Sequence, residues 1–213
     1  MSHFTRLGVL LLTLILGLGA TASVAEASSF DVTVTNLSNQ IFSPPIVVTH
    51  QASVSVFKAG EVASDELAAL AEDADAAGLI ALLGTVSGVR DVGVGDDVIL
   101  PGQSMTVRVD AGGSHRTFTV LGMLVTTNDT FYSARKAVRK SATFTGAAYD
   151  AGSEANTLSC AHIPGPPCGN GGVRVTAGAE GLIKISEGIN RGSLRPFDWR
   201  NPVVKIRVQR AAN

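Results

Sequence analysis

Apolar and polar residues alternate in several short segments of the chain. The segment 30–35 carries its three apolar side chains on one side, and the same period of two recurs in 105–109 and 204–209. This period is typical of a strand with one face in a core. The segment 116–125 is more continuously apolar and predicts a longer, more buried strand. Gly, Pro, Asn and Asp cluster between these segments, so the pattern predicts a mainly β, antiparallel meander or sandwich.

A helical insertion is predicted around 64–83. Ser64 is a suitable N-cap, two acidic residues follow it near the positive end of the helix, and apolar residues then recur with helical spacing. A second short helix is predicted over 77–83, with Gly84 placed to end it. The chain contains no internal repeat and no low-complexity linker, so we expect one domain over 28–213.

Composition excludes two broad classes of protein. Hydrophobic residues make up 45% of the 213 residues, which argues against intrinsic disorder. The formal net charge is −1, so the chain lacks the general basic excess with which proteins grip nucleic acid or anionic lipid. A prediction of function must therefore come from local sequence motifs and not from composition.

The first 27 residues have the layout of a secretory signal peptide. Arg6 precedes the apolar run 7–18, and Ala25 and Ala27 form an Ala-x-Ala cleavage site, with a second such site ending at Ala22. The alternative is a transmembrane anchor, but the run is shorter than the roughly 20 residues that a bilayer span needs. We expect cleavage near Ala27, a secreted (extracellular or periplasmic) protein, and no membrane span in the mature chain.

Both cysteines lie in the exported part, inside a Pro- and Gly-rich segment. An even pair so close together in a secreted protein predicts a disulfide between Cys160 and Cys168. Such a bond contributes about 2–3 kcal/mol of stability. A zinc site that also uses His162 is the alternative, but it lacks a fourth nearby ligand.

Enzyme motifs are absent from the sequence. It has no Gly-x-Ser-x-Gly elbow, no phosphate-binding Gly-rich loop and no His-Glu-x-x-His. Its four histidines are scattered. His50 follows an apolar run and is more often a structural histidine than a base, and His115 follows a Gly-Gly-Ser sequence typical of a hairpin turn. We expect a protein that is not an enzyme and has no catalytic residues.

Acidic residues supply the candidate chemistry. Asp129 lies at the end of the long predicted strand, and Asp150 and Glu154 flank a glycine four residues apart. Carboxylates in loops are the oxygen ligands that Ca²⁺ prefers. The pairs at 96–97 and 73–75 are rivals, although the second lies at a helix end, where a solvated face is expected.

Several segments, in the same order, are similar to those of one known family. They are 30–37, 42–45, 49–50, 63–67, 70–73, the Tyr-Asp-Ala-Gly-Ser-Glu of 149–154, and 202–208. Together they resemble the spondin N-terminal domain, in the form found in secreted single-domain bacterial proteins. The resemblance covers nearly all of the mature chain.

This resemblance implies an antiparallel β-sandwich similar to a C2 domain, with one Ca²⁺ bound in loops at one end. Carried over by position, the metal ligands are Asp129, Asp150 and Glu154. Two departures stand out: the segment 126–130 keeps only the Asp of its family motif, and Glu154 replaces an Asp, which adds one methylene group. The animal relatives are adhesion and matrix proteins, so the resemblance implies binding to an extracellular protein or glycan.

Two other functions compete with this expectation. One is a metal-free structural or surface protein whose acidic residues are solvated. The other is an extracellular hydrolase that works through two carboxylates, one of them with a raised pKa. Three acids in one loop cluster suit a cation better than such a pair.

Overall fold

The computed structural model, which describes Met1 and residues 28–188 and 199–212, is built from antiparallel strands and two short helices. The predicted signal peptide lies, apart from Met1, outside the described residues. The elements are β1 Ser28–Asn36, β2 Ile46–His50, α1 Asp65–Asp73, α2 Ala77–Thr85, β3 Val89–Val94, β4 Ser104–Ala111, β5 Thr117–Met123, β6 Thr130–Ala137, β7 Ser141–Asp150, the 3₁₀ turn Cys160–His162, β8 Lys184–Ser186 and β9 Val204–Arg210.

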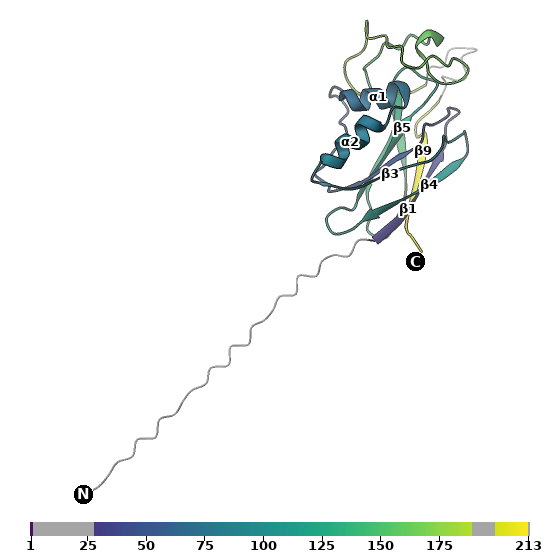
Figure 1. Cartoon of the computed structure of the whole chain (residues 1–213). Helices are drawn as coiled ribbons and strands as arrows, with labels where there is room; N and C mark the ends of the chain where they lie inside the picture. The colour runs from purple at the N-terminus through teal and green to yellow at the C-terminus, as the bar shows by residue number, and fades with distance from the viewer. Residues whose placement is uncertain (2–27, 189–198, 213) are drawn as a thin grey trace.

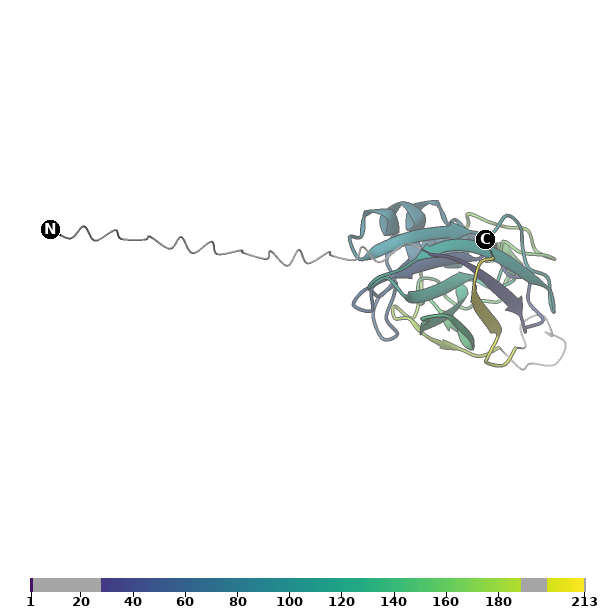
Figure 2. The same ribbon diagram turned by 90° about the horizontal axis from the view of Figure 1, so that it is seen from below.

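The strands form one continuous sheet in the order β3-β2-β5-β6-β7-β9-β1-β4, with β8 paired to β7. Strand β7 joins the two halves, because residues 141–146 pair with β9 and residues 147–150 pair with β6. At the open side, β3 packs against β4: a Cβ added at Gly93 would lie 2.6 Å from Val109. The sheet therefore curls until it is nearly closed (Figures 1 and 2).

The core fills the inside of the curled sheet. Alternating residues of β1, β4 and β9 point inward, as their burial patterns show. Phe42 and Tyr132 stack there with ring centroids 4.1 Å apart, and Phe30 meets Phe118 edge to face. The sequence prediction of half-buried strands over 30–35, 105–109 and 204–209 is confirmed, and the chain is a mainly antiparallel β protein.

The helices cover the outer face of β2, β5 and β6 (Figure 1). Leu67 and Leu70 of α1 and Leu79 of α2 pack with Ile46 and Leu121 in a second apolar cluster. Every residue of β2 and β5 is consequently buried. This explains why 116–125 is continuously apolar: the strand has a core on each side.

The helical insertion starts as predicted and ends differently. The Ser64 hydroxyl accepts a hydrogen bond from the Leu67 amide at 3.3 Å, and two acidic residues follow in the first turn. Helix α1 ends at Ala74, which has a left-handed φ of 58°. Gly84 does not end the second helix, because α2 continues to Thr85 and stops where Val86 becomes extended. Neither of these helices, nor any other described, is long and apolar enough to cross a membrane.

Candidate functional site

Two of the predicted ligands lie side by side at the end of the sheet where β6 begins and β7 ends. Asp129 directly precedes β6, and Thr130 pairs with Asp150 at the end of β7. The Asp129 carbonyl accepts a hydrogen bond from the Ala151 amide at 3.0 Å. The β5–β6 connection and the turn after β7 thus bring together carboxylates that are 21 positions apart in the sequence.

The Asp129 carboxylate is fully buried and only half satisfied. Its Oδ2 accepts hydrogen bonds from the amides of Ser153 at 2.8 Å and Glu154 at 3.0 Å. Among the described residues, its Oδ1 has no hydrogen-bond partner. Gly152 permits this arrangement, because it has a φ of +69° and a Cβ there would lie 2.5 Å from the Leu182 carbonyl oxygen. An unpaired buried carboxylate oxygen is costly, and such atoms often mark the place of an ion or water.

Burial and neighbouring negative charges destabilise the ionised form of both carboxylates. Burial, followed by the charge of Asp150, raises the pKa of Asp129 to about 7, although the two amide hydrogen bonds oppose the shift. Burial also raises the pKa of Asp150, against the hydrogen bond from Asn156. A cation that stabilised the ionised forms of both Asp129 and Asp150 would therefore bind strongly here.

Glu154 meets Asp129 through its backbone, while its carboxylate contacts another loop. Glu154 Oε1 accepts a hydrogen bond from the Val175 amide at 2.6 Å. Burial raises the pKa of Glu154. The hydrogen bond from the Val175 amide opposes this shift without reversing it, and the negative charge of Glu72 adds to it. The structure therefore brings Asp129 and Asp150 together and directs Glu154 toward the segment that carries Val175.

Glu180 is a carboxylate at this end that sequence analysis missed. Asn156 Nδ2 donates a hydrogen bond to Glu180 Oε1 at 2.9 Å and also to Asp150. The negative charge of Glu180 raises the pKa of both Asp150 and Asp129. Burial opposes ionisation of Glu180 itself, but hydrogen bonds from Asn156 and Lys184 outweigh burial and lower its pKa. The only sequence signal was a Glu and a Lys four residues apart in an irregular segment.

Lys184 is a cation that lies beside two of these carboxylates. Its Nζ lies 3.1 Å from Glu180 and 3.6 Å from Asp150. Within residues 28–188 and 199–212, no three His, Cys, Asp or Glu side chains are gathered closely enough to form a complete metal site. The chain instead presents two adjoining carboxylates, with Glu154 and Glu180 on neighbouring loops.

The predicted disulfide is confirmed and supports the loop that carries Asp129. Cys160 and Cys168 are bonded, with their Cα atoms 4.8 Å apart. The zinc alternative is wrong, because both sulfur atoms are used in this bond. Asn128, next to Asp129, accepts from the Leu158 amide at 3.3 Å and donates to the His162 carbonyl at 3.4 Å. The disulfide loop thus packs on the site.

A cavity of about 170 Å³ opens beside the carboxylates. Asp150 and Lys184 lie on its wall, but Asp129 is not among the described residues that line it. Trp199 also contributes, and its buried indole Nε1 has no hydrogen-bond partner within the described part of the chain. Asp150 and Glu187 are therefore the carboxylates among the described residues that line the cavity, and Asp129 lies behind Asp150.

The other candidate residues have structural roles. His50 is fully buried, with Nε2 2.7 Å from the Thr119 hydroxyl and Nδ1 2.7 Å from the Gln51 carbonyl, and burial lowers its pKa. His115 lies in the tight turn between β4 and β5, as expected. The acidic pair at 73–75 is not simply solvated, because Asp73 accepts from the Gly172 amide at 2.7 Å.

No family model matches the chain, and a comparison with curated proteins finds no match.

Proposed function

We propose that this chain is an exported β-sandwich module of the spondin N-terminal, C2-like type that binds one Ca²⁺ for adhesion or cell-surface contact. The observation that carries the proposal is the fully buried Asp129 carboxylate, with an unpaired Oδ1, beside Asp150. A divalent cation would satisfy that oxygen and neutralise both charges. Ca²⁺ tolerates irregular loops of carboxylate and carbonyl oxygens.

Asp129 and Asp150 are the two ligands of this site that the contacts support best. Glu154 is the third ligand that the sequence predicts, and turning its carboxylate inward would cost the hydrogen bond to Val175. Glu180 is the competing third ligand, since its charge already acts on both aspartates. When bound, the ion would hold the loops after β5 and β7 together and present them as a rigid binding surface.

Export is supported by the signal-like N-terminal sequence and by the disulfide. Structural disulfides form mainly in oxidising compartments, outside the cytosol. The bond closes a Pro- and Gly-rich loop that has almost no regular secondary structure of its own. An extracellular protein or glycan is the partner class that such a module would contact.

Lys184 favours the metal-free structural protein as the second candidate. Its ammonium group already lies near Asp150 and Glu180, where it compensates part of their charge without an ion. The hydrolase has less support, because a catalytic acid must contact substrate and Asp129, the carboxylate whose pKa reaches about 7, is buried behind the cavity wall.

Calorimetric titration of the chelator-treated mature chain with CaCl₂ tests the proposal. One calcium should bind to the wild type, and Asp129→Asn and Asp150→Asn should each abolish the heat. Glu154→Gln and Glu180→Gln identify the third ligand. The substitution that weakens calcium binding more marks the residue that coordinates the ion. Asp96→Asn, an exposed aspartate in a loop of the same sheet, is the matched control. If the wild type shows neither heat nor a thermal shift at millimolar calcium, the calcium proposal is refuted and the metal-free structural protein remains.

A further inference from the structure

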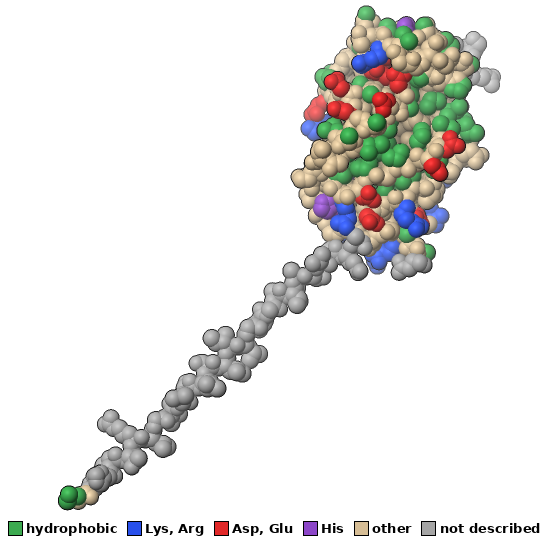
Figure 3. Space-filling model, viewed as in Figure 1, with side chains coloured by type: hydrophobic (Ala, Val, Ile, Leu, Met, Phe, Trp, Pro, Cys, Tyr) green, Lys and Arg blue, Asp and Glu red, His purple; other side chains and the backbone are tan. Residues whose placement is uncertain are grey.

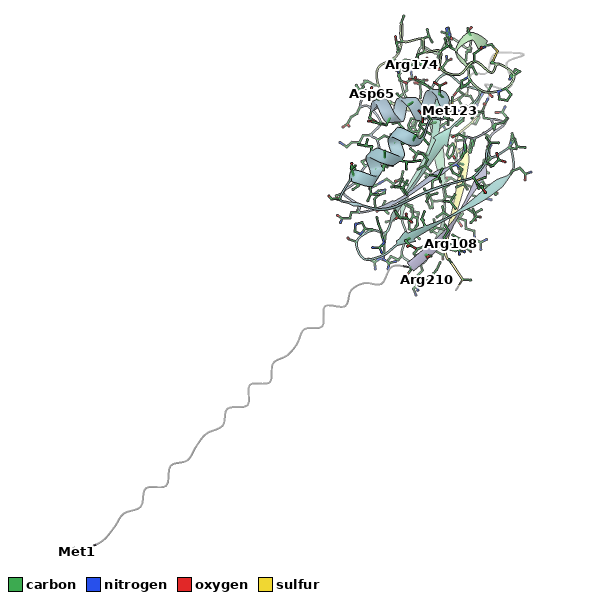
Figure 4. The ribbon with its side chains drawn as sticks, viewed as in Figure 1. Met1, Asp65, Arg108, Met123, Arg174 and Arg210 are labelled. Atoms are coloured by element: carbon green, nitrogen blue, oxygen red, sulfur yellow. A yellow bond between two sulfur atoms is a disulfide. The ribbon has the colours of Figure 1, made fainter. Side chains whose placement is uncertain are left out.

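A basic pocket lies at the end of the domain opposite the carboxylates. Its lining consists of Gly113 and four cationic residues, Arg116, Arg139, Lys140 and Arg210, and its volume is about 430 Å³. Lys140 directly precedes β7 and Asp150 ends it, so the ten residues of that strand separate the two sites by roughly 30 Å. Figure 4 shows Arg210 at the lower end of the domain and Arg174 at the upper end.

Three segments that are distant in sequence build this pocket. Arg116 follows the tight turn between β4 and β5, Arg139 and Lys140 form the connection between β6 and β7, and Arg210 ends β9. Arg116 Nη1 donates to the Arg139 carbonyl at 2.9 Å, and the Val138 amide donates to the Arg116 carbonyl at 2.8 Å. These bonds fix two of the three segments to each other, so the positive charges are held together by the fold.

The charges of the pocket are not neutralised by the described parts of the chain. No described carboxylate lies within 4 Å of these four cationic groups, and no acidic residue is among the described lining residues. The acids on β1 and β4 at this end are engaged elsewhere, since Asp31 pairs with Arg108 at 2.8 Å and Asp110 accepts from the Ser29 hydroxyl at 2.7 Å. Figure 3 shows basic side chains at this end of the domain, with acidic side chains among them on the face in view.

We infer that this pocket binds a sugar unit that carries a phosphate or sulfate ester. Guanidinium groups form paired hydrogen bonds with tetrahedral oxyanions, and Lys140 adds a point charge. The volume falls within the range for small-ligand pockets and exceeds what a lone oxyanion needs. The site is independent of the calcium proposal, because it shares no residue with it.

Calorimetric titration of the mature chain with glucose 6-phosphate and glucose 6-sulfate tests this inference. Either ester should bind, glucose should not, and inorganic phosphate should bind more weakly than the esters. Lys140→Gln and Arg210→Gln should each weaken ester binding about tenfold, the cost of losing one strong ionic hydrogen bond. Arg116 is left unchanged because it also fixes the β6–β7 connection. The control is Lys205→Gln, which removes the same charge from an exposed position of β9.

Three results would overturn the inference. The first is equal affinity for glucose 6-phosphate and inorganic phosphate, which would show that the sugar contributes nothing to binding. The second is an equal loss of binding in Lys205→Gln and Lys140→Gln, which would indicate general charge attraction. The third is Lys140-dependent binding to phosphatidylglycerol vesicles without binding to either ester, which would assign the pocket to a lipid surface.

Discussion

Replacing Asp129 with Asn should have opposite effects on stability in the absence and presence of calcium. Asn has the same shape, and its amide oxygen can keep the hydrogen bonds from the Ser153 and Glu154 amides. Its amide nitrogen would take the place of Oδ1, which has no partner. The substitution therefore removes a buried negative charge from beside Asp150 and retains the turn that surrounds it.

The expected effect follows from the pKa of Asp129, which burial and Asp150 raise from 3.8 to about 7. One pKa unit corresponds to about 1.4 kcal/mol, so ionised Asp129 costs the metal-free fold at most about 4 kcal/mol. The folded protein keeps a proton between pH 4 and pH 7 that the unfolded chain releases. Metal-free wild type should therefore lose stability as pH rises through this window, and the cost should be complete above pH 7.

Urea unfolding of the two proteins with the disulfide intact, in chelator, from pH 4 to pH 8, measures this effect. Asp129→Asn should equal the wild type near pH 4 and exceed it by up to about 4 kcal/mol at pH 8. Calcium at pH 8 should stabilise the wild type and leave the variant unchanged. The reasoning is refuted if the variant is less stable than the wild type in chelator at pH 8, or if the difference does not depend on pH.

Three further predictions concern the fold around the sites, and unfolding measurements test each of them. Gly146→Ala should destabilise by about 1–3 kcal/mol, because its Cβ would lie 2.1 Å from a backbone carbonyl oxygen of β6; a change below 0.5 kcal/mol would contradict this contact. Cys160→Ser with Cys168→Ser should cost about 2–3 kcal/mol and weaken calcium binding, whereas unchanged affinity would separate the loop from the site. Arg174→Gln should cost about 1–2 kcal/mol, because it removes the partner of the buried Glu72 carboxylate, and a neutral result would show that water replaces that partner.

The sequence predicted three strands in which one face is buried and a fourth, over 116–125, in which both faces are buried. Residues 30–35, 105–109 and 204–209 alternate because β1, β4 and β9 face the core on one side and solvent on the other. Strand β7 was not predicted: residues 141–145 do alternate, but the alternation is lost near Gly146, where the strand changes partners. The near closure of the sheet depends on β3 meeting β4, a long-range contact that no local pattern records.

The meeting of Asp129 and Asp150 was expected from the family resemblance and not from the strand pattern, because neither β6 nor β7 was predicted. Asp129 and Asp150 meet because β6 and β7 are adjacent and antiparallel. Glu154 lies one turn further, where its carboxylate is free to meet the Val175 amide, and spacing along the chain cannot fix that direction. Glu180 and the basic pocket come from segments joined only by tertiary structure, so neither has a signature in the sequence.

The most direct test of the calcium proposal is a crystal structure of the mature chain grown with CaCl₂. The account predicts an ion with oxygen ligands at about 2.3–2.6 Å that include Asp129 Oδ1 and the Asp150 carboxylate. A structure at saturating calcium in which Oδ1 contacts only a water molecule or a protonated Asp150, with Lys184 still beside Asp150, would contradict it.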